Sequence, residues 1–181
     1  MAIVNNVKGG FKVCECLIKI RDLPNCSKFT VKHYSNFSVI RITGAKSKVV
    51  YTAWWTGNHV NVTGVQSVSE FDEAVENFLE ITGSNQQFQT KKIHNICASG
   101  QVRLTENLNS LRRKIDGGKR FKSFLNLSFS PALRVKRITN SSPESGVCLI
   151  FSSGKLCFFG FREERVLFEV YESLCASIQE P

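Results

Sequence analysis

The chain has 181 residues, enough for one domain or for two fused half-domains with a substantial core. Hydrophobic residues at 42% are ordinary for a globular protein, but the net charge of +9 is high and favours phosphate backbones or other anionic surfaces as partners. No apolar stretch approaches membrane-spanning length and no signal-peptide core opens the sequence, so we expect no membrane partner.

Alternating and helical patterns divide the first half of the chain into short elements. They predict, in order, a strand over 2–20 interrupted at the glycines near its middle, a short helix over 24–31, and strands over 34–43, 49–55 and 59–64. Ser67 and Glu70 have the spacing of a capping box and predict the start of a second helix. A polar stretch over 83–90 then reads as a linker.

The second half repeats this order. It predicts a strand over 91–104, a helix capped by Thr105, a strand over 127–138, a hairpin, and a last helix that begins near Arg162. The basic run over 119–122 is interpreted as a solvated loop. Both halves therefore predict an antiparallel α+β unit with its helices on one face of the sheet.

The most informative stretch is 149–160, LIFSSGKLCFFG. Its two apolar runs flank the letters SSGK, which predicts a tight β-hairpin. Because side chains alternate along a strand, Leu149 and Phe151 lie on one face, and the alternation continues through Phe159 after the turn. Both faces are apolar, so both must be covered, one of them by the last helix.

This hairpin has a counterpart 96 residues earlier (151 minus 55), where 55–64 reads WTGNHVNVTG. The same offset aligns Arg41 with Arg137. A second match, with an offset of 89 (95 minus 6), aligns Asn6 with Asn95. We therefore expect two copies of one unit of about 90 residues. The expected copies cover 1–85 and 86–181.

These residues resemble the TATA-box-binding protein family. In that family a stretch LIF-x-SGK, followed by apolar residues and TG, occurs twice, each time before an amphipathic helix. Here LIFSSGKLCFFG matches that stretch closely and WTGNHVNVTG matches it loosely. Asn5-Asn6 and His94-Asn95 match the Gln-Asn that begins each copy of the family, and the resemblance runs from about Val4 to Ile178.

The resemblance implies a duplicated saddle, in which a curved antiparallel sheet carries its helices on the convex face. It implies that the concave face binds the minor groove of double-stranded DNA, where aromatic side chains insert between base steps and bend the duplex. It also implies that transcription initiation factors or RNA polymerase subunits dock on the convex helical face. The expected location is nuclear, or the viral replication compartment for a viral protein.

Individual residues take family positions through this resemblance. Phe151 and Trp55 match inserted aromatic side chains, while Asn6 and Asn95 match the asparagines that donate to minor-groove acceptors. Leu149 takes a base-facing position.

Other matches concern the DNA backbone and the base edges. Arg41, Arg137 and Lys155 match residues that contact the backbone. Thr63 matches a base-contacting threonine, whereas Phe159 replaces the second one.

The second aromatic residue of each inserting pair is missing from its expected place, where Ser35 and Pro131 stand. Phe37 and Phe129 lie two residues away, on the same face by alternation, and are candidates to replace them. These departures leave selectivity for TATA sequences in doubt.

Two other functions remain open. A protein–protein interaction module could keep the fold and lose DNA binding, which Lys8, Asn61 and Phe159 on the presumed concave face favour. A third reading is a domain that binds RNA or single strands by stacking bases on Trp55 and Phe151.

Neither catalysis nor a cofactor is expected. The sequence shows no nucleophile with a base, no paired carboxylates and no phosphate loop. Its seven cysteines and three histidines have no zinc-site spacing. Reduced cysteines acting as small hydrophobic residues fit a nuclear or cytosolic compartment.

Overall fold

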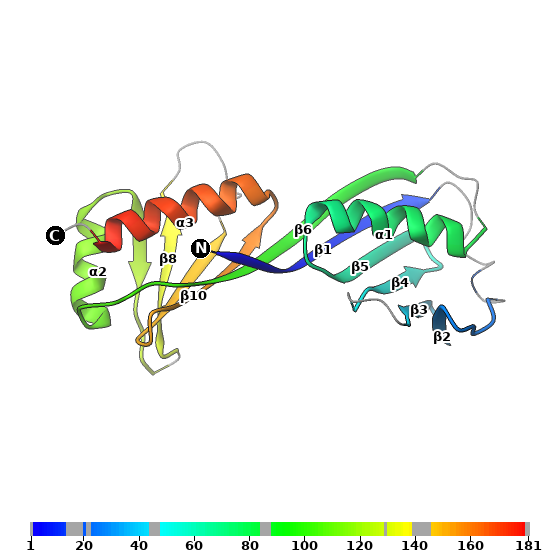
Figure 1. Cartoon of the computed structure of the whole chain (residues 1–181), viewed down its shortest axis with the longest axis horizontal. Helices are drawn as coiled ribbons and strands as arrows, with labels where there is room; N and C mark the ends of the chain where they lie inside the picture. Colours follow the sequence, from blue (N-terminus) through cyan, green and yellow to red (C-terminus); the bar gives the residue numbers. More distant parts are fainter. Residues whose placement is uncertain are drawn as a thin grey trace. The chain divides into compact units, whose positions relative to one another are not determined.

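A computed structural model of the chain describes residues 2–13, 20, 23–43, 48–83, 90–128, 130–138 and 146–179, together with the backbone of residues 88 and 89. Within these residues lie ten strands and three helices (Figure 1). They belong to two compact units: the first unit is Asn6–His94, and the second unit is Met1–Asn5 together with Asn95–Pro181.

The first unit contains one helix, the strands that precede it, and the start of the strand that follows it. Its elements are β1 (Ile3–Val13), β2 (Phe29–His33), β3 (Phe37–Ile42), β4 (Val50–Trp54), β5 (His59–Val65), α1 (Val68–Ile81) and the start of β6 (Phe88–Gln101). The strand order is β2-β3-β4-β5-β1-β6, and the pairs from β2 through β1 are antiparallel.

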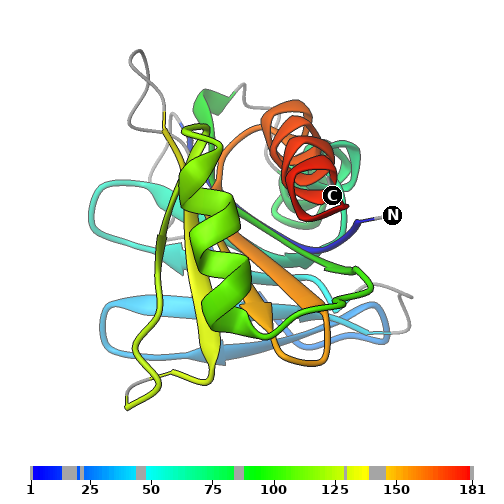
Figure 2. The same cartoon turned by 90° about the vertical axis from the view of Figure 1, so that its left-hand side faces the viewer.

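The second unit repeats this arrangement with an additional helix. Its elements after β6 are α2 (Leu108–Gly117), β7 (Phe121–Phe124), β8 (Ala132–Arg137), β9 (Val147–Phe151), β10 (Lys155–Phe161) and α3 (Glu164–Gln179). The strand order is β6-β10-β9-β8-β7, with antiparallel pairing. Helix α2 packs on β7 and β8, while α3 packs on β10 and on α2 (Figure 2).

The core of the first unit lies between its strands and α1. Phe78 of α1 is fully buried against Phe11 and Tyr51, and Phe71 is fully buried next to Gly9 of β1. The Tyr51 hydroxyl donates to the Ala74 carbonyl at 2.9 Å. Each such fully buried side chain contributes roughly 1.5–3 kcal/mol. Because this burial is so complete, the pKa of the Tyr51 hydroxyl rises to about 12.

The start of α1 confirms the expected cap. Ser67 Oγ accepts a hydrogen bond from the Glu70 amide at 3.0 Å, and Glu70 Oε2 accepts in return from the Gln66 amide at 2.7 Å. The return bond therefore falls one residue before the N-cap, where a capping box would place it on the N-cap itself.

Helix α2 begins later than expected. Its N-cap is Asn107 and not Thr105, because Asn107 Oδ1 accepts from the amides of both Asn109 and Ser110 at 3.0 Å. The apolar residues Leu108, Leu111 and Ile115 of α2 are buried.

Two short strands were not predicted. The expected helix over 24–31 is wrong: residues 23–28 have no regular structure and β2 begins at Phe29, with Phe29 and Val31 buried. In the second unit, the end of the basic run over 119–122 enters β7, where Phe121 and Ser123 are buried beneath α2. Strand β6 also begins at Phe88, inside the expected linker.

Candidate nucleic-acid interface

Each unit has one sheet face that its helices cover and one that they leave uncovered, which we call the open face. In the second unit, Cys148, Ile150, Leu156 and Phe158 are buried on the covered face. Leu149, Phe151, Cys157 and Phe159 are half-buried on the open face, so the predicted alternation is confirmed.

Phe151 ends β9 directly before the turn of the second hairpin. It pairs across the strands with Ala132, and the turn over 152–154 leads to the exposed Lys155. Gly154 has a φ of +80°, and a Cβ there would lie 2.0 Å from the Val102 carbonyl oxygen. Only glycine therefore fits this turn without a backbone shift.

The first hairpin is one residue longer, which changes the predicted site. Its turn covers 55–58, against 152–154 in the second hairpin. As a result Trp54, not Trp55, ends β4 on the open face, paired with His59. A register change of one residue moves every side chain to the other face. The placement of Trp55 on the open face is therefore wrong.

Trp55 instead lies in the turn, and its side chain bonds to a buried residue at the edge of the core. Its indole Nε1 donates to Ser38 Oγ at 3.2 Å, and Ser38 is fully buried. Asn58 takes the left-handed conformation, with a φ of 52°, that glycine takes in the second turn.

Three aromatic rings stack along the open face of the first unit. Phe37 lies between Tyr34, whose ring centroid is 4.7 Å away, and Trp54, also at 4.7 Å. Tyr34 and Trp54 are exposed. Phe37 thus lies where the sequence placed it, while Tyr34 and Trp54 were missed, although Trp54 could have been found by allowing turns of unequal length.

Arg41 and Arg137 do not occupy equivalent places. Arg41 is exposed on the open face, opposite Val50. Arg137 lies on the covered face of β8, where its Nη1 is 3.6 Å from Glu169 Oε2 of α3. The residue equivalent to Arg41 is the exposed Lys136, opposite Val147. The expected open-face position of Arg137 is therefore wrong by one residue.

Asn6 and Asn95 make the same hydrogen bond in the two units. Asn6 Oδ1 accepts from the Gly64 amide at 3.2 Å, and Asn95 Oδ1 accepts from the Gly160 amide at 2.6 Å. Because the carbonyl end of each side chain is bound to backbone, the amide Nδ2 is the end left to donate outward. In Asn95, Nδ2 also lies 3.2 Å from Cys97 Sγ.

Thr63 and Phe159 lie half-buried at equivalent open-face positions, opposite Val50 and Val147. Phe129, the other aromatic residue predicted to insert, lies outside the described residues.

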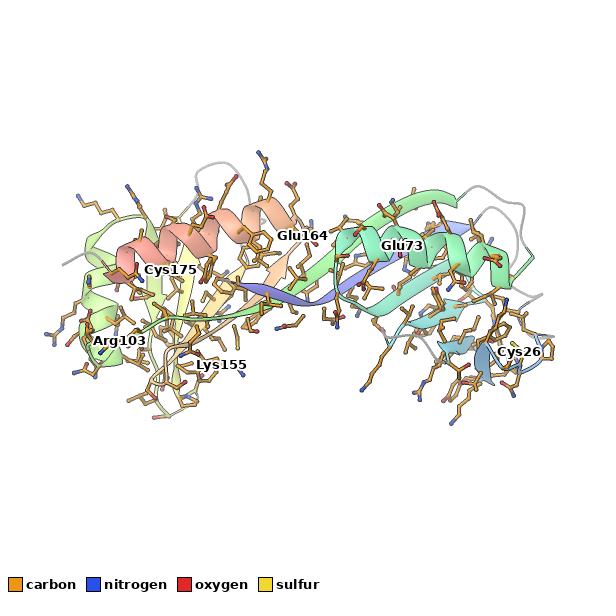
Figure 3. All side chains as sticks on the ribbon, viewed as in Figure 1. Cys26, Glu73, Arg103, Lys155, Glu164 and Cys175 are labelled. Atoms are coloured by element: carbon orange, nitrogen blue, oxygen red, sulfur yellow. The ribbon has the colours of Figure 1, made fainter. Side chains whose placement is uncertain are left out.

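Carboxylates are absent from the open faces of the described residues. Every Asp and Glu that the structure describes lies in a helix or shortly before one, and no described strand contains a carboxylate. Cations lie on both sides of the sheets. Arg112, Arg113 and Arg165 belong to helices, whereas the open faces carry Lys8, Lys12, Lys32 and Arg41 in the first unit and Lys122, Arg134, Lys136 and Lys155 in the second. Figure 3 shows Glu164 on α3 and Lys155 at the turn of the second hairpin.

Of the described cysteines, Cys148 is buried in the core. Burial raises the pKa of the Cys148 thiol far above its usual range, so Cys148 remains protonated. Among the described residues no three His, Cys, Asp or Glu side chains cluster as metal ligands, and none of the described helices is long and apolar enough to cross a membrane.

Comparison with solved structures finds a similar fold. The TBP of Methanococcus jannaschii superimposes with a TM-score of 0.72 at 19% sequence identity, and 99% of each chain is covered. No family model matches the sequence, and no curated protein matches it significantly. At this identity the likeness shows the fold alone. The expected α+β class, a duplicated antiparallel sheet with helices on one face, is confirmed, and the chain has the fold of a TATA-binding protein.

Proposed function

We propose that this chain is a TATA-binding-type transcription factor, which binds and bends duplex DNA from the minor-groove side through its open faces. The helices of the other face would then receive transcription initiation factors or RNA polymerase subunits, in the nucleus or a viral replication compartment.

The observation that carries this proposal is the composition of the open faces. An open face with cations, half-buried aromatic side chains and no described carboxylate matches both requirements of a minor-groove site, phosphate neutralisation and apolar contact with sugars and bases. A face that was only solvated would not need Leu149, Phe151 and Phe159 on it.

Each class of open-face residue has a defined role in this proposal. Arg41, Lys136 and Lys155 neutralise phosphates. The Nδ2 groups of Asn6 and Asn95 donate to the acceptors that A·T pairs present in the minor groove.

The aromatic residues supply the bending. Phe151 inserts between base steps from the second unit, and Trp54, supported by Phe37, does so from the first. Unstacking a step costs a few kcal/mol, which the additional contact area of bent DNA offsets.

One observation favours a second function, a protein-interaction module that does not bind DNA. Helix α1 contains no basic residue, and Glu73, Glu76 and Glu80 on it are exposed. A basic protein partner would fit that helix whether or not the sheet binds DNA.

The test is a fluorescence anisotropy titration of labelled A/T-rich and G/C-rich duplexes at several salt concentrations. We expect A/T preference and a steep loss of affinity with salt. Lys155→Gln should lower the salt slope by about 0.9, the value for one phosphate contact. The matched control Arg165→Gln removes the same charge from α3, where Arg165 is 80% exposed, and should leave the slope unchanged. Absence of duplex binding at low salt would leave only the interaction module.

A further inference from the structure

A groove with a volume of about 300 Å³ runs along the open face of the second unit at β7 and β8, and we call it the β7–β8 groove. Its lining residues are Lys122, Ser123, Phe124, Arg134 and Lys136. None of them was predicted to belong to a functional site. Lys122, Ser123 and Phe124 lie on β7, which was not predicted, and on β8 the sequence match selected Arg137 in place of Lys136.

The ring of Phe124 is held outward by its neighbours. Phe121 is buried beneath α2, and Ser123 is fixed by two hydrogen bonds of 2.8 Å, from its amide and its hydroxyl to Asp116 Oδ1. Alternation then directs Phe124 to the open face, where 59% of it is exposed. A large aromatic ring so placed contributes little to the core and is available for contact.

The cations of the groove have no neutralising partner in the described part of the chain. Lys122 and Lys136 face each other directly across β7 and β8, and Arg134 faces Phe124. Like charges in directly opposite positions destabilise a sheet. None of the three cations makes an ion pair with a described residue, and no described carboxylate shares this face. An anion in the groove would relieve the repulsion.

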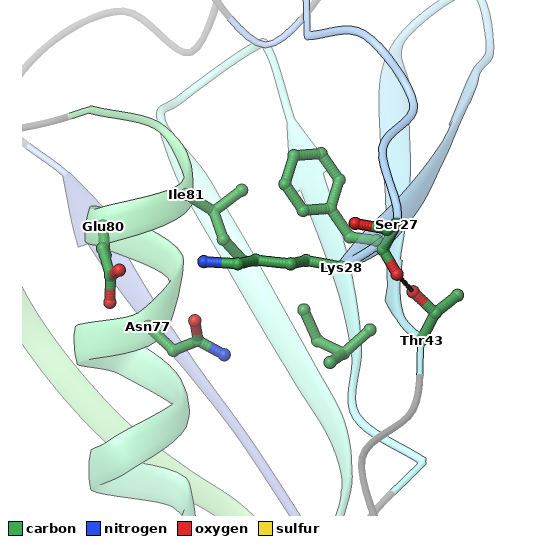
Figure 4. Close-up of a pocket in the computed structure, with 8 residues that line it drawn as sticks. Ser27, Lys28, Thr43, Asn77, Glu80 and Ile81 are labelled. Atoms are coloured by element: carbon green, nitrogen blue, oxygen red, sulfur yellow. Dashed lines mark hydrogen bonds between the residues drawn. The ribbon is translucent and has the colours of Figure 1, made fainter.

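A hollow of the first unit is chemically different. It measures about 500 Å³ on the helix side between α1 and the β2–β3 edge, and it places Lys28 together with Asn77 and Glu80 (Figure 4). Glu80 lines that hollow together with Lys28, whereas every charged residue that lines the β7–β8 groove is a cation.

We propose that the β7–β8 groove binds an unpaired nucleotide of single-stranded nucleic acid. The base stacks on Phe124, and the adjoining phosphates lie between Lys122, Lys136 and Arg134. A cationic groove with an exposed aromatic ring is the composition of sequence-tolerant single-strand sites, because every base has a π-face. In a duplex those faces are covered by neighbouring base pairs. This activity goes beyond duplex binding and does not depend on it.

Anisotropy of labelled oligothymidylate, about ten nucleotides long, with the full chain tests the proposal. We expect binding at low salt, and a loss of affinity of at least about five-fold in Phe124→Ala, the lower end of the effect of one stacked base. Lys122→Gln should lower the salt slope by about 0.7, the value for single strands. The control Leu127→Ala removes an apolar side chain that is 65% exposed and does not line the groove, and should bind like the parent chain.

Three results would overturn the proposal. They are no binding of oligothymidylate, equal affinity of Phe124→Ala and the parent chain for oligothymidylate, or an equal loss of affinity of Phe124→Ala for blunt duplex, which would place Phe124 in the duplex site together with Lys136. Phe124→Leu keeps an apolar side chain and removes only the ring, so it replaces Phe124→Ala if thermal melting shows the alanine variant unfolded. If the chain binds oligothymidylate through Phe124 but does not bind duplex, this inference holds and the proposed function fails.

Discussion

Trp55 donates its indole hydrogen to Ser38 Oγ at 3.2 Å and so ties the first hairpin turn to a fully buried hydroxyl. His33 Nδ1 lies 2.9 Å from the same hydroxyl. Trp54, the residue before Trp55, points to the opposite face of the sheet and packs against Phe37. Two adjacent tryptophans therefore have separate roles, one in stability and one at the proposed interface.

Replacing each tryptophan should separate these roles. Trp54→Ala removes an exposed ring from the open face, so we expect duplex affinity to fall at least five-fold, or about 1 kcal/mol. Trp55→Phe removes the hydrogen bond to Ser38 and should lower the free energy of unfolding by about 1 kcal/mol without changing affinity. Anisotropy titration and urea denaturation of both variants measure the two effects. A larger loss of affinity in Trp55→Phe than in Trp54→Ala would contradict the assigned faces.

Lys136 and Arg137 offer a second pair of neighbours on opposite faces. Lys136→Gln removes an open-face cation, so the salt slope of duplex binding should fall by about 0.9. Arg137→Gln removes the same charge beside Glu169 on the covered face and should leave the slope as it is. The exposed ion pair itself contributes at most about 1 kcal/mol, so both variants should fold. If Arg137→Gln lowers the salt slope and Lys136→Gln does not, then Arg137 and not Lys136 contacts the DNA.

Both corrections have one cause, which explains what the sequence could and could not predict. Strict alternation around Leu149 and Phe151 made the faces of the second hairpin predictable. In the first hairpin, Trp54 and Trp55 are both aromatic, so either of them can be aligned with Phe151. In β8, Lys136 and Arg137 are both basic, so either of them can be aligned with Arg41. When adjacent residues share a chemical type, a gapless match cannot detect that the length of a turn has changed.

Strands β2 and β7 were missed for a different reason. Strand β7 has only two buried positions, Phe121 and Ser123, and one of them is polar. Such a segment becomes a strand because β8 supplies its hydrogen-bond partners and α2 covers one of its faces, and neither contact is local in sequence. The open-face groove at Phe124 was missed together with its strand.

The turn glycine of the second hairpin provides a stability prediction. In Gly154→Ala the new Cβ meets the Val102 carbonyl oxygen and the backbone keeps a φ of +80°, so we expect a loss of at least about 2 kcal/mol of unfolding free energy. Gly117→Ala is the control. Gly117 ends α2 with nothing within 4 Å of the new Cβ, so the variant should gain about 0.5–1 kcal/mol. Urea denaturation measures both, and a neutral Gly154→Ala would show that the turn relaxes.

His59 and Lys155 are the first residues of equivalent strands, but only Lys155 is a lysine. His59 Nε2 lies 3.0 Å from Asn61 Oδ1 in place of the extended cation that Lys155 supplies. His59→Lys places an extended cation at this position, so it should raise the salt slope of duplex binding by about 0.9 and increase affinity at low salt, since it adds a phosphate contact. Gln179→Lys adds the same charge at the exposed end of α3 and should change neither quantity. Equal effects of the two variants would mean that net charge, and not the open face of the first unit, determines affinity for DNA.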